Sequence, residues 1–287
     1  MIDAPLPRDP WSIGIYAGAS AFALAPPPGV ENPIMTREKV TDVPAAFVAD
    51  PFLIHHGSRW HVFFEVMHHG REKGEIGWAH SADAIDWRYG GIVLREPIHL
   101  SYPHVFEHGG AIFMIPETLG AGAVRLYRAE PFPRRWVHIA DLLPGRLADP
   151  TPFWFGDHWW MFACATPTRH DSLSLFVAEN LVGPWREHRA SPIVVDDKTR
   201  ARPAGRVLVT DGCLYRFAQD CGRRYGGAVR TFAIDCLTEH RYSEREEQRG
   251  PMLGASGAGW NGKGMHHVDI HPCGAERWVA AVDGIAL

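Results

Sequence analysis

The sequence predicts an all-β fold, a five-bladed β-propeller, from three observations. Trp87, Trp136 and Trp185 stand 49 residues apart, and each closes a similar stretch of strand-like sequence. Each stretch holds an apolar segment, a turn such as Gly156-Asp157 and a second, aromatic-rich segment, which is the pattern of a β-hairpin. A period of about 50 residues with several short strands and no segment of helical spacing is typical of a propeller blade.

Five copies of this unit imply five blades. The copies begin with similar short motifs, which are Ala49-Asp50-Pro51-Phe52, Ser101-Tyr102-Pro103, Ala148-Asp149-Pro150-Thr151, Arg202-Pro203-Ala204-Gly205 and His266-His267-Val268-Asp269. The predicted blades cover residues 48–97, 98–146, 147–196, 200–250, and 262–287 together with 11–24.

The fifth copy is short, because the sequence ends at Leu287. The stretch from Trp11 to Leu24 is a spare strand-forming segment at the other end of the chain. We expect it to pair with the last blade and to close the ring, since an open sheet edge is a liability. All-β domains commonly reach this length as one unit, so residues 1–287 are predicted to form a single domain.

Charge and hydropathy exclude two classes of partner. A net charge of −4 and a pI near 6.5 leave no support for a basic nucleic-acid-binding face. No run of 18 apolar residues occurs, and Met1-Ile2-Asp3 does not begin a basic and then apolar signal sequence. We therefore expect a soluble, cytoplasmic protein that does not bind nucleic acid and does not span a membrane.

Familiar catalytic and metal-binding motifs are absent. The glycine-rich stretch 257–264 nearly spells a phosphate-binding loop, but it ends in Gly264 where magnesium coordination needs Ser or Thr. The paired histidines lack zinc-hydrolase spacing, and no nucleophile-elbow pattern occurs. We predict no cofactor; a central divalent cation such as calcium near His267 is the alternative, although the ring supplies no recognisable carboxylate cage.

Carboxylates at repeated positions are the strongest functional signal. The first strand of each propeller blade lines the central channel, so the blade starts converge, and two of them carry Asp50 and Asp149. Two acids that face one channel have interacting titrations, which is how a general base and a partner that tunes its pKa arise. The alternative is that both cap Asp-Pro turns, but their matching repeat positions favour function.

Two glutamates interrupt apolar strands at the inner ends of second hairpin strands. Glu65 lies there in blade one and Glu117 in blade two. An unpaired buried carboxylate is costly, so each either forms an ion pair or serves a site. We favour an ion pair for Glu65, whereas both outcomes stay open for Glu117. The candidate partners are Arg125, Arg202, Arg206 and Arg216.

Other polar and aromatic residues near the blade starts would bind a ligand. Their side chains supply hydrogen bonds, charge or a stacking surface for a sugar ring. They are Tyr102, His104, Arg202, Arg206, Asp220, His266 and His267.

The blade starts resemble those of glycoside hydrolase family 43 and related furanosidase propellers. The resemblance implies that Asp50 is a general base and that Asp149 modulates the pKa of the acid. That family carries its general acid as a Glu at the start of blade four, where this sequence has Arg202-Pro203-Ala204-Gly205 instead. His267 matches a blade-five histidine that faces a central metal or water in some members.

A second resemblance covers nearly the whole chain. The sequence is similar to the N-terminal propeller of glucosamine inositolphosphorylceramide transferases and its free-standing bacterial relatives. The resemblance places transferase chemistry in a separate C-terminal domain of the plant proteins, so transfer from a nucleotide donor is not implied. The segments that carry it include Phe47–Phe52, His99–Pro103, Met114–Glu117, Arg202–Arg206, Phe217–Asp220 and Trp260-Asn261 with His266-His267.

The leading hypothesis is a carbohydrate-active propeller that hydrolyses or transfers a glycosyl group. Asp50 would act as base, Asp149 would tune its partner and hold the sugar, and Glu117 would replace the missing acid. The ligand would be a carbohydrate or a glycolipid-derived small molecule. The alternative, favoured by the missing blade-four Glu, is a module that binds a glycan or glycolipid head group without catalysis. A scaffold for protein partners would require a large apolar patch on the rim.

Overall fold

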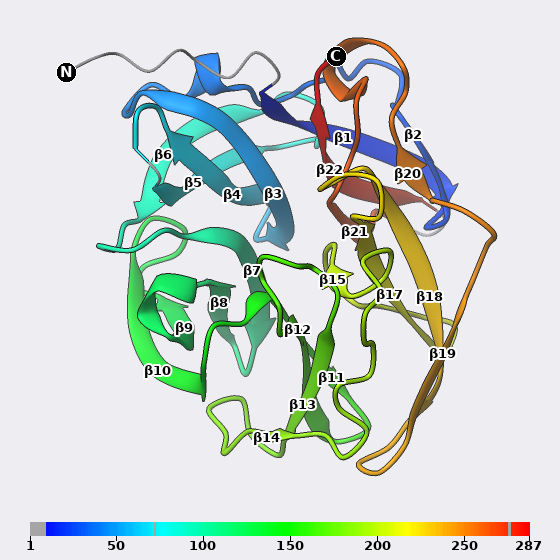
Figure 1. The fold of residues 1–287 in the computed structure, drawn as a ribbon. Coiled ribbons are helices and arrows are strands. Elements are labelled where there is room, and N and C mark those ends of the chain that lie inside the picture. Colours follow the sequence, from blue (N-terminus) through cyan, green and yellow to red (C-terminus); the bar gives the residue numbers. More distant parts are fainter. Residues whose placement is uncertain (1–9, 72, 275–276) are drawn as a thin grey trace.

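The computed structural model describes residues 10–71, 73–274 and 277–287, and it shows five antiparallel sheets arranged around a central axis (Figure 1). The helical content of these residues is limited to three short 3-10 turns, η1 (Arg37–Lys39), η2 (Leu119–Ala121) and η3 (Gly259–Asn261). The predicted all-β, five-bladed propeller is therefore confirmed.

The first three blades each contain four strands that follow one another from the axis to the rim. Blade one contains β3 (Ala45–His56), β4 (Arg59–His68), β5 (Gly74–Ser81) and β6 (Arg88–Leu94). Blade two contains β7 (Ser101–His108), β8 (Ala111–Glu117), β9 (Ala123–Ala129) and β10 (Trp136–Pro144). Blade three contains β11 (Ala148–Phe155), β12 (His158–Cys164), β13 (Leu173–Ala178) and β14 (Arg186–Glu187).

The fourth and fifth blades are less regular. The inner edge of blade four is split into two short strands, and blade five combines strands from both ends of the chain. Blade four contains β15 (Arg202–Pro203), β16 (Leu208–Thr210), β17 (Cys213–Asp220), β18 (Ala228–Leu237), β19 (Tyr242–Glu246) and β20 (Leu253–Gly254). Blade five contains β21 (Val268–Pro272), β22 (Trp278–Ile285), β1 (Trp11–Ser20) and β2 (Ala23–Ala25).

The N-terminal strand closes the ring as predicted. β1 pairs antiparallel with β22, from Trp11 opposite Ile285 to Gly18 opposite Trp278. The two strands lie side by side in Figure 1, dark blue beside red. Because this pairing completes the last sheet, both ends of the chain are held in one blade, and the β22 edge is covered.

The repeated tryptophans have one shared structural role. The indole N–H of Trp87, Trp136 and Trp185 donates to a backbone carbonyl three or four residues earlier, at 2.9–3.1 Å. Each bond fixes the turn that leads into the outermost strand of its blade, which explains the regular spacing of the three residues. Trp78, Trp159 and Trp160 are instead buried between or within the sheets. Burying a large apolar side chain contributes roughly 1.5–3 kcal/mol.

The inner strands of the first three blades carry a bulge at the same repeat position. β3, β7 and β11 each break register with the neighbouring strand there, directly before a proline. Asp50, Tyr102 and Asp149 occupy the bulges with φ values of 53°, 46° and 51°. A left-handed conformation costs a non-glycine residue about 1–3 kcal/mol, so surrounding contacts must hold it. Bulges re-aim side chains next to functional sites, and these three repeat around one axis.

Candidate functional site

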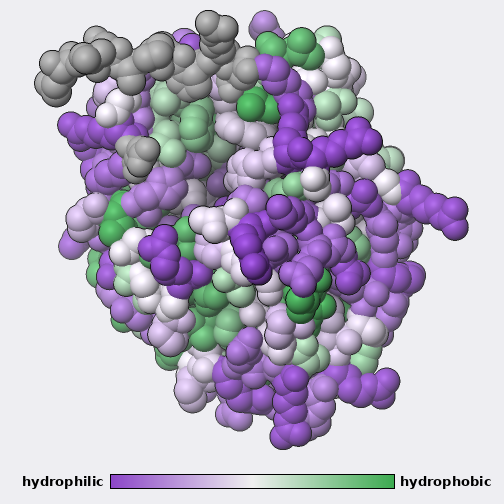
Figure 2. Space-filling view, viewed as in Figure 1, coloured by the Kyte–Doolittle hydropathy of each residue, from purple (hydrophilic) through white to green (hydrophobic). Residues whose placement is uncertain are grey.

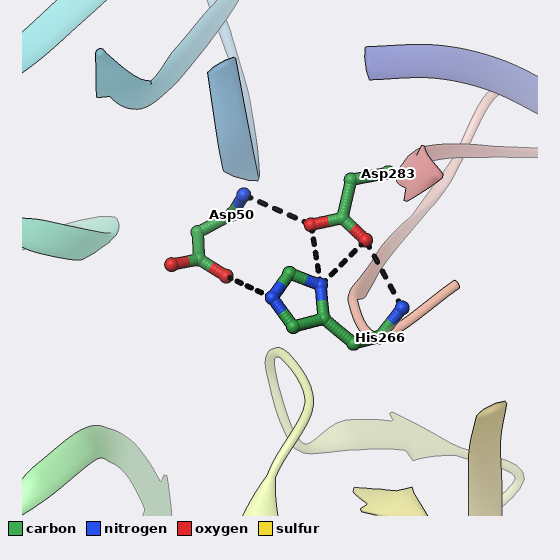
Figure 3. A group of neighbouring side chains, drawn as sticks. All are labelled: Asp50, His266 and Asp283. Carbon is green, nitrogen blue, oxygen red and sulfur yellow. Dashed lines mark hydrogen bonds and ion pairs between the residues drawn. The ribbon is translucent and has the colours of Figure 1, made fainter. Parts of the chain in front are cut away.

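Asp50, His266 and Asp283 form a buried hydrogen-bonded group at the junction of the first and last blades (Figure 3). His266 Nδ1 lies 2.7 Å from Oδ2 of Asp283, and His266 Nε2 lies 3.6 Å from Oδ1 of Asp50. The hydrogen bond between Nδ1 and Asp283 orients the ring of His266. Nε2 is therefore the nitrogen that faces Asp50. This is the geometry of a carboxylate–imidazole pair that exchanges a proton with a second acid.

Burial and charge place this group near its titration range at neutral pH. Burial raises the pKa of Asp50 to about 7; the positive charge of His266 opposes the rise, and the Asp149 carboxylate adds to it. Burial favours the neutral ring of His266, but Asp283 and Asp50 outweigh it and raise the pKa of His266. Asp50 and His266 are therefore a candidate acid–base pair.

The same three residues offer oxygen and nitrogen atoms within 4.8 Å of one another, as a metal site would. However, Asp283 already accepts the backbone N–H groups of Asp50, His266 and His267 at 3.0–3.1 Å. A cation would have to displace these donors as well as the imidazole, so the group fits a hydrogen-bond relay better than a cation site.

His267 is the histidine on the channel axis. Its ring lies against Phe52 and Tyr102, and neither ring nitrogen has a hydrogen-bond partner among the residues that the structure describes. Burial lowers the pKa of His267 to about 4, so the ring is neutral at physiological pH. A neutral imidazole is the form that binds water or a divalent cation, so the central cation stays the alternative to a site without a cofactor.

A second buried group joins blades two, three and four. Arg202 Nε lies 2.6 Å from Oδ2 of Asp149, and its NH2 group lies 3.4 Å from Oε2 of Glu117. Gln219 Nε2 also donates to Oδ2 of Asp149, at 3.0 Å. Glu117 in turn accepts the backbone N–H of Asp149 at 3.1 Å. Glu117 thus meets Asp149 as predicted, but it holds the Asp149 bulge and pairs with Arg202.

Arg202 supplies a single positive charge to two carboxylates. Burial raises the pKa of Asp149 to about 7; Arg202 opposes the rise, and Glu117 adds to it. The carboxylate of Asp149 is a hydrogen-bond acceptor for a ligand with many hydroxyl groups, and Arg202 and Gln219 already fix its orientation. Such fixed orientation is what a site needs to position a substrate.

One exposed aromatic ring touches both groups. Tyr225, in the loop between β17 and β18, is 44% exposed. Its ring centroid lies 5.2 Å from Arg202 Cζ and 5.4 Å from the ring of His266. Trp11 stacks on the other side of the region, 4.0 Å from the His266 ring. Because Arg202 belongs to one acidic group and His266 to the other, Tyr225 bridges the two groups, and we call the two groups together with Tyr225 the candidate site.

Three predicted ligand-binding residues lie outside the two groups and join neighbouring blades. Tyr102 is 0% exposed, and its hydroxyl pairs with Thr151 Oγ1 and accepts the N–H of Gly205, both at 2.8 Å. His104 is also buried, and Arg206 donates to Asp269 Oδ1 at 2.9 Å. These side chains tie the blades together across the axis.

Asp220 does not contact the second group. It accepts a hydrogen bond from Arg230 at 2.8 Å, while its neighbour Gln219 reaches Asp149. Successive residues of a strand point to opposite faces, so a difference of one residue decides which side chain contributes. The strand register would have identified Gln219, because Gln219 lies opposite Arg202 just as Glu117 lies opposite the start of its blade.

The face of the molecule in Figure 2 carries hydrophilic side chains around its centre, with hydrophobic residues in separate patches. This view therefore gives no support to a protein-binding scaffold with one large apolar patch. Within the described part of the chain, no helix has both the length and the apolar character needed to cross a membrane.

Comparison with solved structures shows similarity in fold. The catalytic domain of the GH62 α-L-arabinofuranosidase from Coprinopsis cinerea superposes with a TM-score of 0.60 at 12% identity, over 82% of this chain and 90% of that one. A thermostable family-43 glycoside hydrolase superposes with a TM-score of 0.53 at 16% identity, over 71% and 76% of the two chains.

Comparison with protein families shows relatedness in sequence. The family described as "Glucosamine inositolphosphorylceramide transferase 1, N-terminal" matches residues 7–285. The protein named glucosamine inositolphosphorylceramide transferase 1 from Oryza sativa subsp. japonica is 36% identical over 296 residues, which is 96% of this chain. The chain spans 40% of the length of that relative. It therefore belongs to the family of the N-terminal domain of glucosamine inositolphosphorylceramide transferases.

Proposed function

We propose that the candidate site binds a carbohydrate and hydrolyses or transfers a glycosyl group. The observation that carries the proposal is the meeting of two buried acidic groups, centred on Asp50 and Asp149, beneath the exposed ring of Tyr225. Acid–base chemistry on a sugar requires acids whose pKa values are raised toward neutrality, an oriented imidazole and an exposed aromatic ring.

The ligand class is proposed from the relatives. They are named for glucosamine and inositolphosphorylceramide, a sugar and a lipid that carries an inositol phosphate group. The propeller neighbours include an arabinofuranosidase. A carbohydrate or a glycolipid-derived small molecule suits a site that presents carboxylates, an amide and an aromatic ring.

Asp50 is the proposed base. Its carboxylate takes a proton from water, or from an acceptor hydroxyl, as the oxygen attacks the anomeric carbon of the sugar. His266, held by Asp283, stabilises the Asp50 carboxylate before the reaction. Asp149 accepts hydrogen bonds from sugar hydroxyls, while Arg202, Gln219 and Glu117 keep it in place. In this proposal Glu117 supports the site, because it pairs with Arg202 and accepts the backbone N–H of Asp149.

The test is turnover of aryl pyranosides and aryl furanosides by the wild type and by Asp50→Asn. General base catalysis contributes about 100- to 10,000-fold, so the wild type should release the aryl alcohol and Asp50→Asn should lose activity by that factor. Asp211→Asn is the matched control, since Asp211 has the same left-handed conformation as Asp50 but is exposed, in the turn between β16 and β17. Equal activity of Asp50→Asn and the wild type would remove the assignment.

A binding module without catalysis is the second candidate. Arg202 stands where related propeller glycosidases carry their general acid, and it neutralises part of the charge of Asp149. Calorimetry separates the two functions. Heat of binding with no product from any glycoside in the series would favour the module, and product release would favour the enzyme.

A further inference from the structure

Three carboxylates occupy equivalent places around the channel, on the second strands of their blades. They are Glu65 on β4, Glu117 on β8 and Asp283 on β22. Two of them hold the bulge of the next blade: Glu117 accepts the N–H of Asp149, and Asp283 accepts the N–H of Asp50, each at 3.1 Å. By the same arrangement Glu65 would hold the bulge at Tyr102.

Glu65 has no such role. Its carboxyl group makes no hydrogen bond to any residue that the structure describes, and its Oε1 atom is completely buried. The Tyr102 bulge is held instead through the tyrosine hydroxyl, which pairs with Thr151 and Gly205. The ion pair with arginine expected for Glu65 is also absent among the described residues. A buried carboxyl oxygen without a hydrogen bond costs a few kcal/mol, so the presence of Glu65 is not explained by stability.

The surroundings of Glu65 favour its protonated form. Burial raises the pKa of Glu65 well above its ordinary value, and the nearby charges of Asp50, Glu117 and Asp149 raise it further. The closest cationic candidate is His99, whose Nε2 atom lies 3.6 Å from Glu65 Oε1. Since His99 Nδ1 accepts the N–H of Gly74 at 2.8 Å, the neutral ring carries its proton on Nε2. That N–H faces Oε1, which leaves Oε2 of Glu65 to carry the acid proton.

We propose that Glu65 is the proton donor of the candidate site, in place of the acid that the start of blade four lacks. This inference rests on the proposed glycosyl chemistry. As the bond between the anomeric carbon and the leaving oxygen breaks, the electron pair goes to that oxygen, which takes the proton from Glu65 Oε2. Asp50 takes a proton from the attacking water or hydroxyl, and solvent then returns Glu65 and Asp50 to their starting states.

The test compares leaving groups in the same enzyme. Glu65→Gln keeps the shape of the side chain but has no acid proton. With aryl glycosides whose phenol leaves poorly, we expect turnover to fall about 100- to 10,000-fold. With dinitrophenyl glycosides, whose leaving group needs no proton, turnover should stay within a few-fold of the wild type. The alkaline fall in kcat/KM should also disappear in the variant, because it reports deprotonation of Glu65.

Glu75→Gln is the matched control. Glu75 is a buried carboxylate of the same blade, but it pairs with Lys73 at 3.3 Å and with Arg95 at 3.5 Å. It should show no dependence on the leaving group beyond that of the wild type. Equal loss by Glu65→Gln on both substrate types, or no loss on either, would overturn the role of Glu65 and leave the proposed function intact. Absence of turnover by the wild type itself would overturn both.

Discussion

Asp283 accepts the backbone N–H of Asp50 at 3.1 Å, although the two residues are 233 positions apart in the sequence. The bond joins the last blade to the first at the point where Asp50 adopts its left-handed conformation. The same carboxylate holds the ring of His266. One side chain therefore closes the ring, supports a strained residue and orients the imidazole of the candidate site.

Replacing Asp283 with Ala should destabilise the protein and change the titration of His266. Removing one partner of a buried ion pair costs roughly 3–5 kcal/mol, because the other charge stays buried without compensation. The pKa of His266 should fall, since burial favours the neutral ring once the carboxylate is gone. Urea unfolding measures the first effect, and NMR of the His266 ring measures the second. An unchanged unfolding midpoint would contradict the role of Asp283 in ring closure.

The pH dependence of activity should show a limb near neutrality. Burial raises the pKa of Asp50 to about 7, and a general base works only when it is deprotonated. We therefore expect kcat/KM to fall as pH drops through about 7. The limb should move to lower pH in a variant that adds a positive charge nearby, because a cation favours the Asp50 carboxylate. A profile that stays flat from pH 5 to pH 8, on the order of three units, would exclude Asp50 as the titrating base.

Replacing Arg202 with Met should make stability more dependent on pH. Arg202 opposes the rise in the pKa of Asp149, so its removal raises that pKa further. The folded state then binds a proton that the unfolded chain, with an aspartate pKa of about 3.9, releases. The variant should lose stability as pH rises from about 4, and its deficit relative to the wild type should be larger at pH 8 than at pH 5. Denaturant titrations at the two pH values measure this difference.

Replacing Tyr225 with Ala should weaken ligand binding and leave the fold intact. The side chain is 44% exposed and lies at the surface over Arg202 and His266, outside the sheets, so its loss should leave the propeller unchanged. An aromatic contact contributes roughly 1 kcal/mol, which is about a five-fold change in Kd. Calorimetry with a bound sugar measures the loss of affinity, and the thermal midpoint serves as the control. A lower thermal midpoint with unchanged affinity would show that Tyr225 is a structural residue.

The repeat pattern predicted the fold well, because blade spacing and strand pairing depend on local signals. The 49-residue tryptophan spacing and the spare strand near Trp11 were enough to predict five blades and their closure. Asp149 and Glu117 were correctly brought together because both belong to regular copies of the repeat. The sequence did not reveal Asp283, because its contacts with Asp50 and His266 depend on how the last blade meets the first and not on a local signal.

The side-chain contacts of the site were less predictable than the blade positions. Tyr102 and Arg206 lie near blade starts as expected, but Tyr102 is buried and Arg206 donates to the Val105 carbonyl instead of to either group of the candidate site. Asp220 and Gln219 differ by one position, and only the strand register decides which of them reaches Asp149. Tyr225 lies in a loop outside the repeated strands, so no periodic signal marks it.

The central claim is that acids from separate blades meet in one sugar-binding site. The most direct measurement is a crystal structure of the Asp50→Asn variant soaked with candidate pyranoses and furanoses. We predict a sugar ring against Tyr225, with its hydroxyls in hydrogen-bond contact with Asp149 and the side chain at position 50. A sugar bound elsewhere on the molecule, with the candidate site free of ligand at a saturating sugar concentration, would contradict the account.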